Sequence, residues 1–181
     1  MAAIAREIKP GYHAAMSTAA VLTISDTRSD GTAEDLSGPA AEEMLADAGI
    51  EVTHRDIVPD DDDAIHAKVQ SLVDQVSLIV TTGGTGIAIR DVTPEAVAPL
   101  IDKPLPGFGE IMRTGSFSKT PLSIISRGGA GIAGRTLIVM LPGSPRGVRD
   151  GLGLLGPAIR HVLQFLAGGP VRCEPGPMPD A

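Results

Sequence analysis

The stretch TTGGTG at residues 81–86 decides the fold class of this chain, together with RDVTPE at residues 90–95. It directly follows the apolar run Leu78-Ile79-Val80, which is typical of a buried strand. A buried strand that ends in glycines leaves bare backbone N–H groups at the carboxyl edge of a sheet, where small anions can be bound. Open α/β sheets bind their ligands at that same edge. The stretch therefore predicts a strand followed by an anion-binding loop.

A helix is expected directly after this loop. Thr93 is predicted as its N-cap, Pro94 as its first helical residue and Glu95 as an acid in its first turn. Asp91 then lies at the mouth of the loop, where a carboxylate could hold a metal ion that bridges phosphates.

Outward from this segment, further apolar runs predict strands at residues 19–24, 50–58 and 137–141. Helical spacing of apolar residues predicts helices between them and after the last strand. One of these helices is expected to be capped by Asp63, and the final helix is expected to be kinked or divided at Pro157. Apolar strands alternating with amphipathic helices predict a parallel sheet covered on both sides.

Composition favours one compact domain. The chain has 181 residues, is 43% hydrophobic and only 2% aromatic, and carries a formal net charge of -7. That charge argues against a nucleic-acid partner. The single cysteine, Cys173, excludes an internal disulfide and suits a cytoplasmic location. No apolar run approaches the ~20 residues needed to span a membrane, so we expect no membrane partner.

The domain organisation expected from these patterns has three parts. Residues 1–17 are predicted to form a flexible N-terminal arm, 18–167 the folded domain and 168–181 a loose Pro/Gly-rich tail.

Two glycine-rich segments need a choice of interpretation. GAGIAG at residues 129–134 fits the dinucleotide-binding spelling, but it precedes a strand instead of following one. We expect a mobile loop near a ligand there, with Ser126 and Arg127 just before it supplying a hydroxyl group and a cation. The 83–86 loop is not a phosphate loop of the Walker type, because no Lys-Ser/Thr pair follows it.

Two further segments are expected at the same sheet edge. The four aspartates at 60–63 are typical of a solvated loop before a helix, but Asp60 also follows a strand end and could share Mg²⁺ with Asp91. PGS at residues 142–144 ends the last strand, and Ser144 is predicted to cap the final helix, whose N-terminus also suits an anion.

Together these residues resemble the MogA/MoaB family of molybdenum cofactor biosynthesis. The resemblance rests on LTISD at 22–26, TGGTG at 82–86, RDVTPEA at 90–96, PGFGE at 106–110, SR at 126–127 and LPGS at 141–144. It implies a three-layer α/β sandwich with a mostly parallel central sheet (the molybdopterin-binding fold), and a homotrimer or hexamer in the cytoplasm.

The resemblance also implies a function. Adenylyltransferase members of the family bind molybdopterin and transfer AMP from ATP to its terminal phosphate with Mg²⁺, releasing pyrophosphate. A molybdenum-insertion enzyme is the implied partner. Carried over by motif, Asp91 and Asp60 are the implied catalytic and metal-binding acids. The implied substrate-binding residues are Ser25, Asp26, Gly83, Gly84, Thr85, Gly86, Glu110, Ser126, Arg127, Pro142, Gly143 and Ser144.

Two alternatives stay open at this point. One is a non-catalytic molybdopterin-binding or scaffold protein of the MoaB type. The other is a nucleotide-pyrophosphatase-like relative of the same fold.

Overall fold

The computed structural model describes residues 17–169. The predicted N-terminal arm and C-terminal tail, including Cys173, therefore lie almost entirely outside the described residues. Within residues 17–169, no helix is both long enough and apolar enough to cross a lipid bilayer.

A six-stranded sheet forms the middle of the molecule, with strand order β2-β1-β3-β6-β5-β4. The four strands expected from the apolar runs are all present and run parallel, whereas two further strands at one side run antiparallel. The parallel strands are β1 (Thr18–Ile24), β2 (Glu51–Val58), β3 (Leu78–Thr82) and β6 (Thr136–Leu141), and the antiparallel ones are β4 (Lys103–Pro104) and β5 (Ala130–Ala133).

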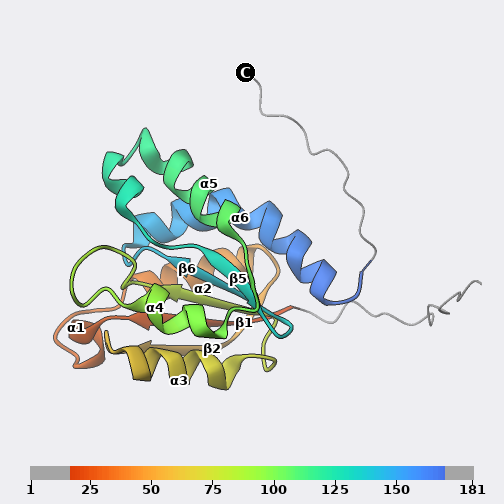
Figure 1. Ribbon diagram of the computed structural model, residues 1–181, viewed down its shortest axis with the longest axis horizontal. Coiled ribbons are helices and arrows are strands. Elements are labelled where there is room, and N and C mark those ends of the chain that lie inside the picture. Colours follow the sequence, from red (N-terminus) through yellow and green to blue (C-terminus); the bar gives the residue numbers. More distant parts are fainter. Residues whose placement is uncertain (1–16, 170–181) are drawn as a thin grey trace, which may run out of the picture.

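Helices cover both faces of this sheet, which confirms the three-layer α/β fold (Figure 1). Side chains alternate along β3: Leu78 and Val80 pack in one core with α2, α5 and α6, and Ile79 packs in the other with α3 and α4. The helices are α1 (Asp26–Ser29), α2 (Ser37–Asp47), α3 (Asp62–Leu72), α4 (Thr93–Val97), α5 (Pro106–Phe117) and α6 (Pro145–Leu166), with short 3₁₀ turns η1 (Ala98–Leu100) and η2 (Pro121–Ile125).

The register of the parallel strands brings their carboxyl ends to one edge. Ile24 pairs with Val58, Thr23 with Thr82, and Thr82 with Leu141. The loops that begin at residues 25, 59, 83 and 142 therefore leave the sheet side by side, as the sequence predicts.

The expectation of a mobile loop at 129–134 is wrong. Residues 130–133 form the buried strand β5, which pairs with β6 through a turn at Gly134, where φ is +56°. Alanine and glycine give no apolar pattern that marks a strand, and the hydrogen bonds to β6 come from a partner later in the chain.

Several helix boundaries also differ from expectation. Asp61, not Asp63, caps α3, since its side chain accepts a hydrogen bond from the Ala64 amide at 2.9 Å. A short helix, α1, follows β1 at once, although no helical spacing of apolar residues marks it in the sequence. Helix α6 is not divided at Pro157, since it runs through this residue as a single 22-residue helix. Proline has no backbone N–H, so Pro157 cannot donate a hydrogen bond to the carbonyl of Gly153, four residues earlier. Both residues are exposed, so water can donate to that carbonyl instead.

Candidate functional site

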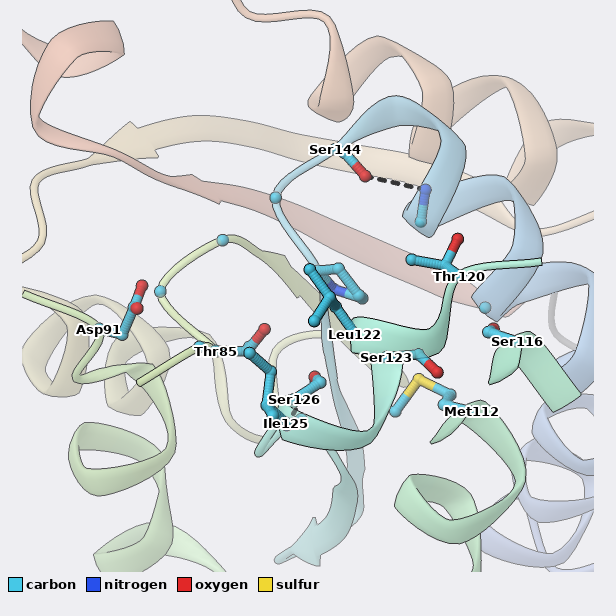
Figure 2. A pocket seen from close by; sticks show the side chains of 18 of the residues that line it. Thr85, Asp91, Met112, Ser116, Thr120, Leu122, Ser123, Ile125, Ser126 and Ser144 are labelled. Carbon is cyan, nitrogen blue, oxygen red and sulfur yellow. Dashed lines mark hydrogen bonds between the residues drawn. The ribbon is translucent and has the colours of Figure 1, made fainter. Parts of the chain in front are cut away.

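A cavity of about 490 Å³ opens at the carboxyl edge of the parallel strands. One wall comes from the loops that follow β1, β2, β3 and β6, and the opposite wall comes from α5, η2 and the start of α6. Figure 2 shows Thr85 and Asp91 on one side of this cavity and Met112, Ser116, Thr120 and Ser123 on the other.

Two glycines of the loop lie so close to neighbouring atoms that no side chain fits at either position. Gly83 has a φ of +108°, and a Cβ atom there would overlap the carbonyl oxygen of Ile24. Gly84 has a φ of +60°, and its Cβ would overlap the hydroxyl of Thr93. The amides of Gly84, Thr85 and Gly86 donate to no acceptor within the described part of the chain. The loop therefore offers three backbone donors to an anion.

Thr93 holds this loop in place through two hydrogen bonds. Its hydroxyl donates to the Gly83 carbonyl at 2.9 Å, and its amide donates to the Gly84 carbonyl at 3.1 Å. The prediction that Thr93 is the N-cap of α4 is wrong, because Val92 holds that position. The fully buried Thr93 thus serves the loop and not the helix end.

Two carboxylates border the glycine loop. Asp60 follows β2, and its Oδ1 lies 3.3 Å from where a Cβ on Gly84 would stand. Asp91 lies at the other end of the loop, with Oδ2 2.8 Å from the equivalent point on Gly86, and that oxygen accepts a hydrogen bond from the Ala88 amide at 2.8 Å. Both acids line the same cavity, as expected.

Burial raises the pKa of the Asp60 carboxyl above its ordinary value. The backbone hydrogen bond from Asp26 opposes that shift, the negative charge of Asp26 reinforces it, and the smaller effects of Arg90 and Asp91 lower and raise the pKa respectively. A carboxyl group in such surroundings gains from a bound cation.

The carboxylate oxygens of Asp60 and Asp91 are donors of the kind that Mg²⁺ prefers in proteins. Among residues 17–169 there is no group of three or more His, Cys, Asp or Glu side chains placed to hold a metal. A Mg²⁺ ion held by these two carboxylates would keep most of its positions for water and substrate oxygens, as this ion commonly does.

Three arginines of the cavity wall were not anticipated: Arg28, Arg113 and Arg146. Arg113 donates to the carbonyls of Ser126 and Gly128, each at 3.2 Å, and so joins α5 to the 126–128 segment. Arg146 lies in the first turn of α6, with its side chain 68% exposed and its Nε 3.7 Å from Asp150. Isolated arginines outside a motif give no signal in the sequence, and only the fold brings them to the cavity.

Most of the predicted site residues meet at this cavity. Those that line it are Ser25, Asp60, Gly83, Gly84, Thr85, Gly86, Asp91, Ser126, Pro142, Gly143 and Ser144. Asp26, Glu110 and Arg127 are not part of the lining. Asp26 is hydrogen-bonded to Asp60, and Glu110 is exposed on α5. Arg127 donates a hydrogen bond to the carbonyl of Gly86.

Ser144 caps α6 as predicted, because its hydroxyl accepts a hydrogen bond from the Gly147 amide at 3.1 Å (Figure 2). The capping and the cavity-lining roles therefore coincide at this residue.

Comparison with known proteins gives the family. A family model described as a probable molybdopterin binding domain matches residues 20–161. The chain belongs to the MogA/MoaB family. It is 43% identical over 152 residues to the molybdopterin adenylyltransferase of Helicobacter pylori strain J99, covering 82% of this chain and 86% of that protein. It is 42% identical over 153 residues to the molybdenum cofactor biosynthesis protein B of Staphylococcus carnosus, covering 81% and 89%.

Solved structures of the same family share the fold. The molybdopterin biosynthesis enzyme MoaB of Thermus thermophilus is 41% identical, with a TM-score of 0.80 over 86% of this chain and 99% of that one. A molybdopterin biosynthesis protein of Mycobacterium abscessus is 37% identical, with a TM-score of 0.81 over 85% and 98%.

Proposed function

We propose that this protein is a molybdopterin adenylyltransferase of molybdenum cofactor biosynthesis, which transfers AMP from ATP to the terminal phosphate of molybdopterin and releases pyrophosphate. The observation that carries the proposal is the meeting of the glycine loop with Asp60 and Asp91 at one cavity. The adenylyltransferase at 43% identity supports the same reaction.

The terminal phosphate of molybdopterin would bind the free amides of the 84–86 loop. In this position it lies between Asp60 and Asp91, which border the loop. Phosphoryl-type transfer depends mainly on positioning and on stabilising charge, so the chain needs no nucleophilic side chain. The fixed backbone dipoles need no reorganisation as charge develops.

Asp60 and Asp91 would hold Mg²⁺ together with phosphate oxygens of ATP. Bound there, the ion would neutralise part of the negative charge that keeps the two substrates apart. Arg146 and Arg28 face the cavity from other walls and would add positive charge along the polyphosphate.

The proposal extends to the assembly, the compartment and the partner. We infer a homotrimer in the cytoplasm that hands its product to a molybdenum-insertion enzyme. Large apolar side chains that stay exposed on the single chain, including Ile87, Leu122 and Ile124, support an assembly. Light scattering on the purified protein tests this, since a molar mass of one chain would contradict it and three chain masses would support it.

The reaction is tested by pyrophosphate release from ATP and Mg²⁺ with purified protein, with and without molybdopterin. Release that requires molybdopterin, with an adenylylated product, supports the proposal. Tight molybdopterin binding without release supports the non-catalytic MoaB-type alternative instead. Release from ATP alone, without molybdopterin, would favour a pyrophosphatase-like activity.

A further inference from the structure

Residues 86–91 lead from the glycine loop to Asp91, and this segment is anchored on one side through the side chain of its own residue Arg90. Its guanidinium group grips both oxygens of Asp26, with Nε 3.0 Å from Oδ2 and Nη2 2.8 Å from Oδ1 and 2.7 Å from Oδ2. Asp26 follows β1 and is 64 positions away in sequence. This geometry joins the segment to the sheet edge by charge-assisted hydrogen bonds.

Arg127 holds the same segment from the other side. Its Nε donates to the Gly86 carbonyl at 2.7 Å, its Nη2 donates to the Asp91 carbonyl, and its Nη1 pairs with Glu95. Its own amide donates to the Thr85 carbonyl at 2.8 Å. The guanidinium groups of Arg90 and Arg127 therefore both donate their hydrogen bonds to acceptors of the protein itself.

Asp26 connects Arg90 to the opposite acid. The Asp26 side chain accepts a hydrogen bond from the Asp60 amide at 3.0 Å, and the Asp26 amide donates to Asp60 Oδ2 at 2.9 Å. Arg90 precedes Asp91 in the chain. The contacts thus run from Asp91 through Arg90 and Asp26 to Asp60, across the mouth of the glycine loop.

We propose that Arg90 is a positioning residue that sets the separation of Asp91 and Asp60 by anchoring the 86–91 segment to Asp26. This inference rests on the proposed function for its kinetic consequences, but its structural consequence does not. Arg90 is absent from the residues that line the cavity, and Asp26 occupies its guanidinium group. It therefore acts through Asp91 and not by binding a substrate phosphate.

Arg90→Ala is expected to lower kcat roughly 10- to 100-fold, because small displacements of reacting groups are that costly. KM for ATP and for molybdopterin is expected to change less than about threefold, since the glycine amides and Arg146 stay in place. Arg90→Lys keeps the charge but loses the two-point grip, so it should recover part of the lost turnover.

The matched control is Arg55→Ala. Arg55 makes a similar exposed ion pair, with Nη1 3.1 Å from Glu42, but this pair joins β2 to α2 and makes no contact with residues 86–91. It is expected to leave both kcat and KM unchanged.

A second measurement needs no substrate. The amides of Ala88 and Asp91 are hydrogen-bonded within the segment, to the Asp91 side chain and the Ala88 carbonyl respectively. In ligand-free Arg90→Ala, hydrogen exchange in residues 87–91 is expected to be about tenfold faster than in the wild type and in Arg55→Ala, because the segment opens locally.

Unchanged exchange in residues 87–91 would overturn the proposal. So would an Arg90→Ala variant with wild-type kcat and a raised KM, because that pattern belongs to a substrate-binding cation. If the wild-type protein shows no adenylyl transfer, the proposed function fails, and the exchange experiment still decides whether Arg90 anchors the segment.

Discussion

Asp26 and Asp60 exchange hydrogen bonds: each carboxylate accepts from the other residue's backbone amide, at 3.0 and 2.9 Å. The two residues follow β1 and β2 and are 34 positions apart in sequence. This reciprocal pair fixes the ends of two neighbouring strands, and it fixes Asp60 at the border of the glycine loop. The arrangement explains how Asp60 keeps a defined position although it lies in the loop between β2 and α3.

Asp26→Ala is expected to lower the free energy of unfolding by about 1–2 kcal/mol, because the half-buried Asp60 amide and Arg90 both lose their acceptor. Urea denaturation measures this. Asp47→Ala is the control, since Asp47 ends α2 away from the cavity. Equal stability of the Asp26 and Asp47 variants would show that the reciprocal pair contributes nothing.

Asp60 predicts a pH effect on stability. Its pKa in the folded protein lies above the ordinary value of 3.8, so the folded state binds more protons than the unfolded state as the pH rises above about 4. Folding stability therefore falls with rising pH through this window as Asp60 ionises. Relative to the wild type, Asp60→Asn is expected to gain stability as the pH rises, and thermal unfolding from pH 4 to 8 measures it. A difference between the two proteins that is constant across this range would contradict the raised pKa.

Gly83→Ala is expected to cost at least about 3 kcal/mol of unfolding free energy, because a strained backbone and an overlap with a backbone carbonyl add together. Gly49→Ala is the matched control: its φ is +76°, but a Cβ there would meet nothing within 4 Å. It should cost only about 1 kcal/mol, for backbone strain alone. Chemical denaturation compares the two, and equal losses would show that the close approach of Gly83 to Ile24 is unimportant.

Arg146→Ala is expected to raise KM for ATP about tenfold with little change in kcat, because it removes a cavity cation from the start of α6 while leaving the acids in place. Arg149→Ala is its control on the same helix, since Arg149 pairs with Glu43 at 2.7 Å and does not line the cavity. Steady-state kinetics separates the two. An equal effect of both variants would mean that net charge, not contact with substrate, matters.

The sequence predicts those parts of the fold that produce a local pattern of apolar residues. The runs at β1, β3 and β6 are apolar because both faces are buried, and parallel strands bring their following loops to one edge. Placing Asp60 and Asp91 at one cavity needed only this rule and the motifs. The β5 strand escaped prediction because its small residues pair with β6 through contacts that no local pattern shows.

The roles of individual polar side chains depended on tertiary contacts in the same way. Thr93 satisfies the local rules for an N-cap, but in the fold it is the first residue of α4, and its hydroxyl donates to the Gly83 carbonyl. Arg127 has the charge of a phosphate ligand, but the carbonyls of Gly86 and Asp91 occupy it. Such competition between acceptors is decided by which segments the fold brings together.

The proposed adenylyl transfer is tested most directly by following the α-phosphate of ATP. With ATP labelled at that phosphorus, Mg²⁺ and molybdopterin, wild-type protein is expected to move the label onto molybdopterin as AMP. Asp91→Asn should bind molybdopterin with nearly wild-type affinity and transfer the label far more slowly. Molybdopterin that binds tightly to the wild-type protein but never acquires the label, or an Asp91→Asn variant that transfers it at the wild-type rate, would contradict the proposed reaction.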